Sequence, residues 1–344
     1  MIELMRVDDF DYVLPEELIA QTPLERRDHS RLLVVHRDTG MLEDRSFSSI
    51  TEYLRPSDVL VLNDTRVIPA RLYGQNPQKS GVVELLLLRP LGDGHWEVLV
   101  KPGKKARVGA EIVFSPALSC KVVDVTPSGG RHVEFVYTGD FDSILETLGE
   151  TPLPPYIHER LDDPERYQTV YSKHAGSVAA PTAGLHFTPE LLETIEGLGV
   201  AVVPLTLHVG LGTFRPVKAD RVEDHVMHEE YYELSEESAA IINDRLRAGG
   251  RVFAVGTTSV RVLETLADDR GHVRAGSGWT DIFIYPGYRF RVVDVLLTNF
   301  HLPKSSLLML VSAFADTQTI RFAYEHAILE RYRFFSFGDG MLLV

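Results

Sequence analysis

Three short polar stretches of the chain bring hydroxyl, amide and imidazole side chains to the ends of apolar runs. They read "AAPTAGLHFT" at 179–188, "VGTTSVRVLE" at 255–264 and "LLTNFHLPKSS" at 296–306. Hydroxyls and amides hold ligands through hydrogen bonds, and imidazole moves protons near neutral pH. The stretches therefore predict a site that binds a polar small molecule and performs acid–base chemistry.

A fourth polar run, "LNDTRVIPARL" at 62–72, follows a buried apolar run in the same way. Hydroxyls also cap helices and Asn-Asp pairs also make turns, so each candidate has a structural explanation beside the functional one. The candidates for ligand binding are Asn63, Asp64, Thr65, Arg66, Thr182, Gly184, Gly256, Thr257, Thr258, Ser259, Asn299 and His301.

Histidines recur at the expected edge of this site. His186, His208 and His301 each lie at a predicted strand end or in a polar turn, where one histidine alone is usually just packed. Three together favour proton transfer by at least one of them. In "DHVMHEEYY" the spacing is H-x-x-H-E, which does not place two histidines around a glutamate on one helical face. We therefore expect no metal site.

Other motifs exclude several classes of cofactor. "HVGLGTF" at 208–214 continues into Pro216 rather than into a helix, which argues against a dinucleotide loop, and the sequence has no P-loop. The single cysteine, Cys120, excludes internal disulfides and cysteine-rich zinc sites. These motifs therefore predict neither a nicotinamide or flavin site nor a P-loop nucleotide site. Without an export signal or an apolar run of membrane-spanning length, the sequence predicts a soluble cytoplasmic protein, and we expect a monomer.

The charge is unevenly distributed. The net charge of -14 argues against general affinity for nucleic acids, yet residues 71–150 hold 9 Lys and Arg against 10 Asp and Glu. Four basic side chains gather in "KPGKKARVG" at 101–109 and fit either a solvated hairpin tip or a contact with phosphates. These four, here named the basic loop, are Lys101, Lys104, Lys105 and Arg107.

The spacing of apolar residues predicts the elements that position these groups. Residues 31–47 read as two strands joined by a turn, followed by a short helix at 48–54 and a buried strand at 58–64. From 72 to 136, short β-rich runs predict a small antiparallel barrel or sandwich. Beyond the Pro-rich "TPLPPYI", strands alternate with helices, and the predicted strands include "SVAAP" at 177–181 and "DIFIY" at 281–285.

This pattern predicts a discontinuous α/β domain with a β-rich insertion. The early strands are too few to fold alone, so we expect them to join the later sheet. The expected limits are 1–68 with 151–344 for the α/β domain and 69–150 for the insertion. Because ligands bind beyond the carboxyl ends of strands in open α/β sheets, the polar stretches should share one pocket.

Taken together, eight motifs in this order resemble the S-adenosylmethionine:tRNA ribosyltransferase-isomerase family of queuosine biosynthesis. They are "VLNDTRVIPARL", "AAPTAGLHFT", "LHVGLGTFRPV", "HVMHEEYYEL", "VGTTSVRVLE", "TDIFIYPGY", "LLTNFHLPKSSLLMLVSAFA" and "YRFFSFGDGML". The resemblance implies an α/β domain with an inserted β-barrel. It also implies transfer of the ribosyl unit of S-adenosylmethionine to 7-aminomethyl-7-deazaguanine at the tRNA wobble position, giving epoxyqueuosine, adenine and methionine.

That chemistry gives the candidate residues expected roles. A base must remove a proton from C5′ of the donor, and carboxylates or aromatic faces, such as Glu229, Tyr231 and Tyr285, suit the sulfonium. The donor carboxylate suits Arg66 or the helix start at Thr257. The candidate catalytic residues are His186, His208, His228, Glu229 and Asp281. The candidate tRNA contacts are Arg71 and the basic loop.

Two other functions stay open at this point. A non-catalytic RNA-binding protein would use the barrel for RNA, although binding alone needs no titrating groups at strand ends. Another S-adenosylmethionine-dependent tRNA-modifying enzyme, such as a methyltransferase, would usually carry a glycine-rich strand-turn near its start, which this chain lacks. We expect tRNA and S-adenosylmethionine as partners, and neither a membrane nor a protein partner.

Overall fold

A computed structural model describes residues 5–126, 129–210 and 217–344 of the chain. The chain divides into two compact units. The sheet unit comprises residues 1–65, 154–174 and 180–344, and the barrel unit comprises 66–153 and 175–179. The domain limits predicted from the sequence, with the insertion at 69–150, stay a prediction.

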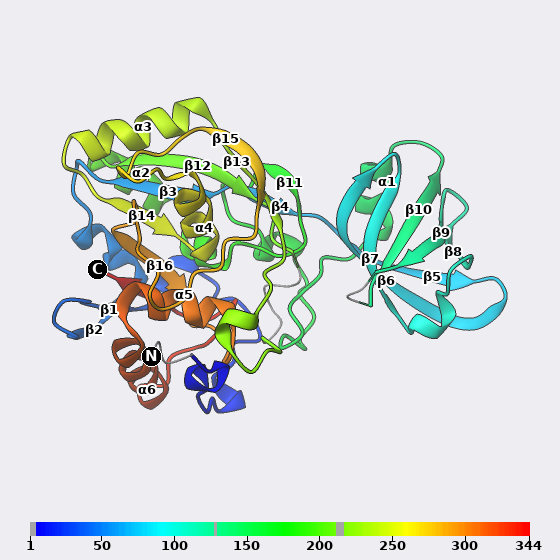
Figure 1. Cartoon of the computed structure of the whole chain (residues 1–344), viewed down its shortest axis with the longest axis horizontal. Coiled ribbons are helices and arrows are strands. Elements are labelled where there is room, and N and C mark those ends of the chain that lie inside the picture. Colours follow the sequence, from blue (N-terminus) through cyan, green and yellow to red (C-terminus); the bar gives the residue numbers. More distant parts are fainter. Residues whose placement is uncertain (1–4, 127–128, 211–216) are drawn as a thin grey trace. The chain divides into compact units, whose positions relative to one another are not determined.

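The sheet unit is built on nine strands, and its four central strands run parallel (Figure 1). The strand order is β15 (Gly276–Thr280), β13 (Glu230–Leu234), β12 (Ala201–Leu207), β3 (Val59–Asn63), β14 (Val252–Val255), β16 (Val295–Asn299), β17 (Gly340–Leu343), β1 (Arg31–Val35) and β2 (Leu42–Ser46). β12, β3, β14 and β16 are the parallel strands, so their carboxyl ends meet at one edge. β3, β14 and β16 are buried throughout, as expected for strands covered on both faces.

Helices surround this sheet. The α-helices are α2 (Pro189–Gly197), α3 (Glu236–Arg247), α4 (Thr257–Leu266), α5 (Ser306–Ala315) and α6 (Thr317–Leu329). The 3-10 helices are η1 (Val7–Phe10), η2 (Glu16–Leu18), η3 (Arg27–His29), η4 (Phe47–Tyr53), η6 (Pro164–Tyr167), η7 (Thr182–His186) and η9 (Val222–Asp224). At α2 the Thr188 side chain accepts from Leu191 N and Pro189 takes the first turn, which confirms the predicted helix start.

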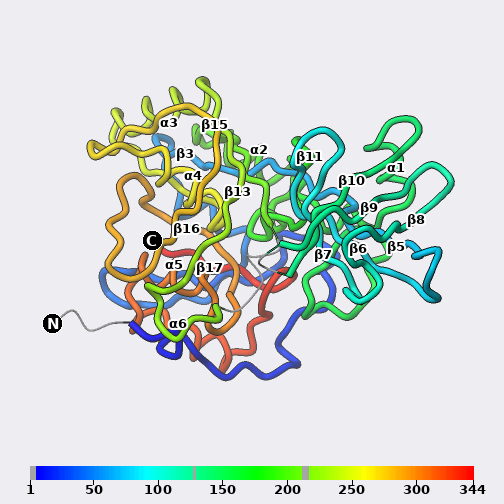
Figure 2. Tube along the Cα trace, turned by 45° about the vertical axis from the view of Figure 1, so that its right-hand side comes forward, coloured from blue at the N-terminus to red at the C-terminus, as the bar shows by residue number. Residues whose placement is uncertain are grey.

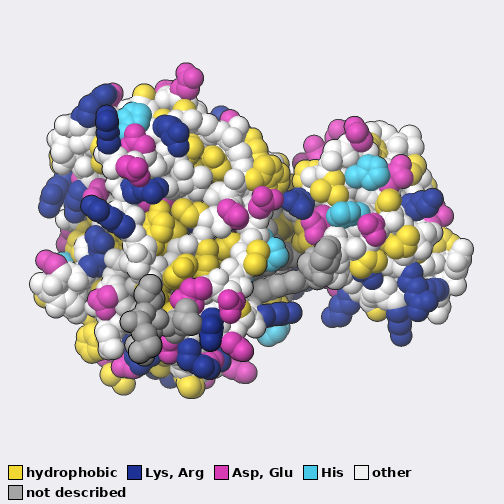
Figure 3. Space-filling model, viewed as in Figure 1, with side chains coloured by type: hydrophobic (Ala, Val, Ile, Leu, Met, Phe, Trp, Pro, Cys, Tyr) yellow, Lys and Arg dark blue, Asp and Glu magenta, His cyan; other side chains and the backbone are white. Residues whose placement is uncertain are grey.

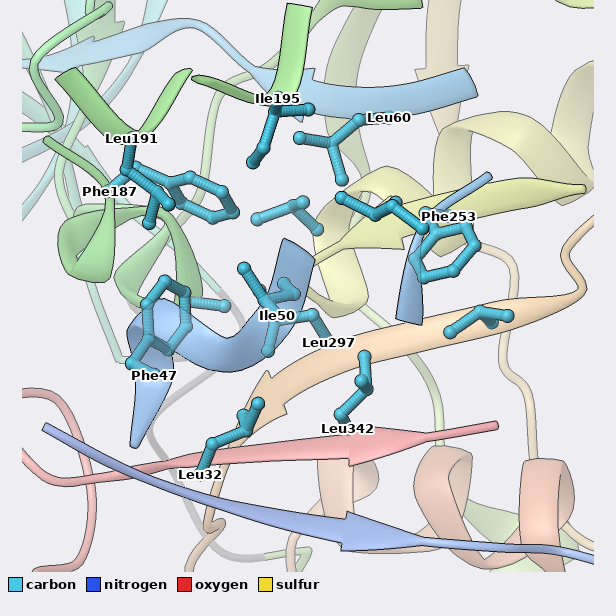
Figure 4. Close-up of a cluster of buried hydrophobic side chains, with 14 of the residues drawn as sticks. Leu32, Phe47, Ile50, Leu60, Phe187, Leu191, Ile195, Phe253, Leu297 and Leu342 are labelled. Carbon is cyan, nitrogen blue, oxygen red and sulfur yellow. The ribbon is translucent and has the colours of Figure 1, made fainter. Parts of the chain in front are cut away.

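The core of the sheet unit joins segments from the whole length of the chain. Leu60, Phe253 and Leu297 of three central strands share one buried cluster with Phe47 and Phe187, in which Phe253 lies on the opposite side from the other two rings (Figure 4). β1 and β17, from opposite ends of the sequence, pair in parallel and lie side by side (Figure 2). The early strands therefore complete the later sheet, as predicted.

The barrel unit is a closed, six-stranded antiparallel barrel. Its order is β10 (Arg131–Tyr137), β7 (His95–Lys101), β6 (Lys79–Gly92), β5 (Arg71–Asn76), β8 (Glu111–Ser115) and β9 (Leu118–Val125). The helix α1 (Phe141–Leu148) follows the last barrel strand, and β4 (Thr65–Val67) pairs with β11 (His174–Ser177). A mixed α/β unit with an inserted antiparallel barrel confirms the predicted fold class.

Two predicted strands are wrong in position. The run 281–285 is not a strand, because Ile282 N donates to the Thr280 hydroxyl and Ile282 O accepts from Arg261 Nε, so side chains replace a strand neighbour. In the run 177–181 only the first residue belongs to β11, because the Ser177 hydroxyl donates to Ala179 O and closes a local turn. The predicted short helix at 48–54 is the 3-10 helix η4.

Candidate active site

A pocket with a cavity volume of about 50 Å³ lies at the carboxyl ends of the parallel strands and opens to solvent. All three polar stretches contribute to its wall, as the sequence predicted. The residues that line it are Tyr156, Ala180, Pro181, Thr182, Ala183, Val209, Gly256, Thr257, Thr258, Thr298, Asn299, Phe300, His301, Leu302, Leu307, Phe335 and Ser336. A few polar groups among apolar ones are typical of the lining of small-molecule sites.

The start of α4 forms one wall. Gly256 precedes the helix with φ +84°, a conformation that favours glycine, and its N–H donates to Leu297 O of the neighbouring strand. Among the described residues no side chain caps the helix, and Thr257 and Thr258 at its start line the pocket, so the unsatisfied N–H groups of the first turn lie beside it. This end of the helix favours negative charge.

The hydroxyls of the "GTTS" turn have different environments. The Ser259 hydroxyl donates to Val255 O at 2.7 Å and is therefore structural. Thr257 and Thr258 both line the pocket, and Thr258 is only 8% exposed. The Thr258 hydroxyl oxygen is buried and has no hydrogen-bond partner within the described part of the chain. A buried, unpartnered hydroxyl beside a pocket is well placed for a ligand.

Asn299 connects the pocket wall to His186. Its Oδ1 accepts from the Thr182 hydroxyl at 3.0 Å, while its Nδ2 faces Phe335 O at 3.2 Å and His186 Nε2 at 3.2 Å. Because Phe335 O can only accept, the Asn299 amide nitrogen must donate on this side, and His186 Nε2 therefore accepts. The proton of the imidazole then lies on Nδ1, which faces the Ser30 hydroxyl at 2.8 Å. Burial, with the charges of Arg333 and Arg27, lowers the pKa of His186 to about 3.

His186 is thus a neutral imidazole with both ring nitrogens engaged. It lines an adjoining pocket rather than the one described above. Gly184, in the same 3-10 helix, leaves room for the Tyr171 ring, since a Cβ there would lie 2.0 Å from the Tyr171 hydroxyl oxygen. The stretch 182–186 therefore shapes the wall that Thr182 and Asn299 present to the pocket.

His301 and Tyr156 are the titratable side chains among the described residues that line the pocket. Burial lowers the pKa of His301 to about 3, and burial raises the pKa of Tyr156. The His301 ring contacts the Thr298 hydroxyl through Nε2 at 2.8 Å. Its backbone is held by two tyrosines, because His301 N donates to the Tyr324 hydroxyl and the Tyr12 hydroxyl donates to His301 O.

The run that follows β3 packs away from the pocket-lining residues of the described chain. Asn63 Nδ2 donates to Leu207 O and Leu207 N donates to Asn63 Oδ1, both at 3.0 Å, which ties β3 to β12. The Asp64 carboxylate accepts from the Thr206 hydroxyl at 2.7 Å, and burial raises its pKa. The amide and carboxylate at this strand end therefore have structural partners.

His208 lies beside this strand end. Thr65 Oγ1 contacts His208 Nδ1 at 2.8 Å, and the His208 ring stacks on Tyr231 with centroids 5.8 Å apart. Burial, and then the charge of His174, lower the pKa of His208. Arg66 belongs to the barrel unit.

The other predicted catalytic residues do not line the pocket in the described chain. His228, Glu229 and Asp281 are exposed. Next to them the structure reveals a buried ion pair that the sequence did not single out, between Glu230 of β13 and Arg261 of α4. Both side chains are about 5% exposed or less.

The ion pair organises the edge of the sheet. Glu230 Oε1 accepts from Gly210 N at 2.8 Å, and Arg261 Nη2 donates to Thr280 O at 3.1 Å. Arg261 follows Thr257 by four residues and Thr258 by three, so it lies on the same face of α4, one turn further along the helix. A buried acid and base at distant sequence positions carry no local signal, which is why the pairing was missed.

The basic loop lies on the barrel, around the 3-10 helix η5 (Gly103–Lys105). Figure 3 shows Lys and Arg side chains gathered on the lower side of the barrel unit. Two further cations join the loop, since Lys79 Nζ donates to Lys104 O at 2.8 Å and Arg131 Nε donates to Ala106 O at 2.7 Å. The predicted contact Arg71 instead pairs with Glu84 at 3.2 Å.

Metal-binding clusters and membrane-spanning helices are both absent from the described part of the chain. The described residues contain no group of three or more His, Cys, Asp or Glu side chains arranged to hold a metal ion. No described helix is long and apolar enough to cross a bilayer. Most of the glycine run at 208–214 falls in residues 211–216, outside the described residues. The monomeric state and cytoplasmic location stay predictions.

Comparison with known proteins identifies the family. A sequence model described as queuosine biosynthesis protein matches residues 7–343. The S-adenosylmethionine:tRNA ribosyltransferase-isomerase of Symbiobacterium thermophilum is 60% identical over 341 residues, covering 99% of this chain and 100% of that protein. The crystal structure of S-adenosylmethionine tRNA ribosyltransferase from Thermotoga maritima is 40% identical with a TM-score of 0.56, covering 98% and 100% of the two chains. This chain therefore belongs to the queuosine biosynthesis protein family.

Proposed function

We propose that this enzyme transfers the ribosyl moiety of S-adenosylmethionine to 7-aminomethyl-7-deazaguanine at the wobble position of a tRNA and isomerises it. The products are epoxyqueuosine-tRNA, adenine and methionine. The name of the relative that is 60% identical over its full length supports this reaction class. S-adenosylmethionine acts here as a substrate that is consumed, not as a resident cofactor.

The observation that carries the proposal is the pocket with the unpartnered hydroxyl of Thr258. Its polar groups come from Thr257, Thr258 and Asn299, while Phe300 and Leu307 supply apolar surface. An adenosine derivative needs this combination, because its base is flat and apolar on both faces while its edges and its ribose form hydrogen bonds.

The charge distribution orients the donor in this proposal. The uncapped start of α4 attracts the carboxylate of the methionine part, because the first-turn N–H groups carry partial positive charge. The sulfonium then lies toward the aromatic rings of Tyr156 and Phe335, whose faces attract cations. Asn299, held by His186 and Thr182, presents its amide to the ligand in one orientation.

We assign the proton acceptor at C5′ to His301. Its imidazole lines the pocket and is neutral at pH 7, because burial holds its pKa at about 3. A neutral imidazole has a lone pair that can take a proton. His186 is a positioning residue in this scheme, since both its ring nitrogens have partners. The two tyrosines that clamp the His301 backbone keep the ring in place.

We assign contact with the tRNA to the barrel. The basic loop, with Lys79 and Arg131 beside it, offers six cations in an acidic protein. A wobble base in an anticodon loop is single-stranded, so presenting it costs little and phosphate contacts can supply the affinity.

Incubation of the enzyme with S-adenosylmethionine and precursor-bearing tRNA tests the proposal. Release of adenine and methionine, with loss of the free aminomethyl group, is the expected result. A methyltransferase leaves S-adenosylhomocysteine instead, and an RNA-binding protein releases neither. The His301→Gln variant should still bind the donor but lose exchange of its C5′ hydrogen with deuterated solvent. Retained exchange in that variant would remove His301 from the role.

A further inference from the structure

A second pocket of the sheet unit carries two arginines. It has a cavity volume of about 30 Å³ and opens to solvent. Its wall consists of residues from η3 and the loop before it, from η6 and η7, and from the loop before β17. The residues that line it are Pro23, Leu24, Arg27, Ser30, Arg166, Leu185, His186, Ser336, Phe337 and Gly338. The pocket is therefore a separate cavity whose charged side chains are both cations.

These arginines lack acidic partners in the described part of the chain. Arg27 donates to Gln168 O at 2.6 Å and to Glu165 O at 2.9 Å. Arg166 donates to Glu25 O at 3.1 Å and also to Leu24 O. Every one of these partners is a backbone carbonyl, and none of the carboxylates in the described chain forms an ion pair with either guanidinium or lines the pocket.

The carbonyls hold both guanidinium groups rigidly, and donors remain. The Nε of Arg166 is buried and has no hydrogen-bond partner among the described residues. Burial, followed by the positive charge of Arg166, lowers the pKa of Arg27, while the acids of Asp163 and Glu165 oppose this in part. Two half-buried cations close enough to repel each other are stabilised when an anion lies between them.

The arginine pocket adjoins the candidate active site. Ser336 lines both pockets, and the His186 ring that lines one holds the Asn299 amide that lines the other. A substrate bound in the active site can therefore extend an anionic group toward Arg27 and Arg166. Arginine is suited to this role because its planar fork matches the geometry of carboxylates and phosphates.

We propose that the pocket of Arg27 and Arg166 binds an oxyanion carried by a substrate, either a phosphate of the RNA or the carboxylate of the donor, which would then bind here in place of the start of α4. The proposal rests on the proposed function for the identity of those substrates. The site itself rests on two rigid cations without acidic partners and on the unpartnered Nε of Arg166.

The test compares binding by the full-length protein and four variants. Arg166→Gln removes one cation of the pocket, and Arg160→Gln is its control, an exposed arginine in the same segment that does not line the pocket. Leu24→Glu places a carboxylate at the pocket, where it competes with the oxyanion, and Leu24→Gln is the uncharged match. Thermal unfolding checks that each variant folds. If Arg166→Gln does not fold, the comparison of Leu24→Glu with Leu24→Gln tests the oxyanion site by itself.

Titration with S-adenosylmethionine and with tRNA distinguishes the two sources. If the oxyanion is the carboxylate, Arg166→Gln and Leu24→Glu weaken donor binding roughly tenfold or more, and a decarboxylated donor binds wild type and variants alike. If it is a phosphate, tRNA binding weakens instead and its logarithmic salt dependence falls by about 1. The two control variants should match wild type in both cases.

A substrate-independent arm uses sulfate as the probe. At matched ionic strength, replacing chloride by sulfate should raise the unfolding temperature more for Leu24→Gln than for Leu24→Glu. Equal donor binding, equal tRNA binding and equal sulfate response across all variants overturn the proposal. Failure of the proposed function shows separately, as absence of adenine release by the wild-type enzyme.

Discussion

Replacing Thr258 by valine should change stability and ligand binding in opposite directions. The side chain is 8% exposed on α4, and its hydroxyl lines the pocket without a partner in the described chain. Valine keeps the shape of threonine and removes the hydroxyl. In the ligand-free protein the substitution therefore deletes a buried polar group and breaks no described hydrogen bond.

The size of both effects follows from this environment. A buried polar group without a partner costs about 1–3 kcal/mol, so Thr258→Val should raise the free energy of unfolding by about 1–3 kcal/mol. A net hydrogen bond to a ligand contributes about 0.5–1.5 kcal/mol, which corresponds to a loss of roughly 2- to 10-fold in affinity for S-adenosylmethionine.

Urea unfolding and calorimetric titration measure the two quantities. Thr265→Val is a matched control on the same helix, because its hydroxyl contacts Arg261 O and the Thr280 hydroxyl, both at 2.7 Å. The control should lose stability and keep its affinity for the donor. A Thr258→Val protein that is destabilised by more than about 1 kcal/mol, or that binds the donor as tightly as wild type, would refute the reasoning.

Three further results are expected. Burial lowers the pKa of His186 and His301 to about 3, so between about pH 6.5 and pH 3 only the unfolded chain takes up their protons. As pH falls through this range, each histidine should reduce the free energy of unfolding by about 1.4 kcal/mol per pH unit. Urea titrations of His301→Gln should show the loss of its share. Changing the three lysines of the basic loop to alanine should raise the Michaelis constant for tRNA and flatten its salt dependence without altering donor binding. Unchanged tRNA kinetics would exclude the loop as a tRNA contact. Arg261→Met, which removes the cation beside the buried carboxylate of Glu230, should cost about 3–5 kcal/mol in chemical denaturation, and Glu230→Gln in the same protein should restore part of it.

Local sequence was sufficient for most of the fold. Alternating and continuous apolar runs located β1, β3, β12, β14 and β16, because their burial follows directly from their residues. Helix starts such as Thr188 were also predictable, because a cap acts within a few residues. The misplaced strand at 281–285 shows the limit, since Arg261 of a distant helix binds that backbone.

Candidate site residues were predictable by type and not by role. The sequence placed Thr182, Thr258, Asn299 and His301 at strand ends, and the fold brings all four to one pocket. It also favoured His186 as a base, whereas the structure surrounds that ring with partners. Whether an imidazole is available depends on neighbours that are far away in the chain, and spacing within a motif does not contain them.

By itself, then, the sequence determined the order of the elements, the polar turns at strand ends, the basic loop of the barrel and the family resemblance. Each of these depends on residues that are neighbours along the chain. Tertiary structure alone decided which hydroxyl lacks a partner, how Glu230 pairs with Arg261 and where Arg27 meets Arg166. The physical reason is that hydrogen bonding, desolvation and charge pairing depend on distances in space, which the packing of remote segments sets.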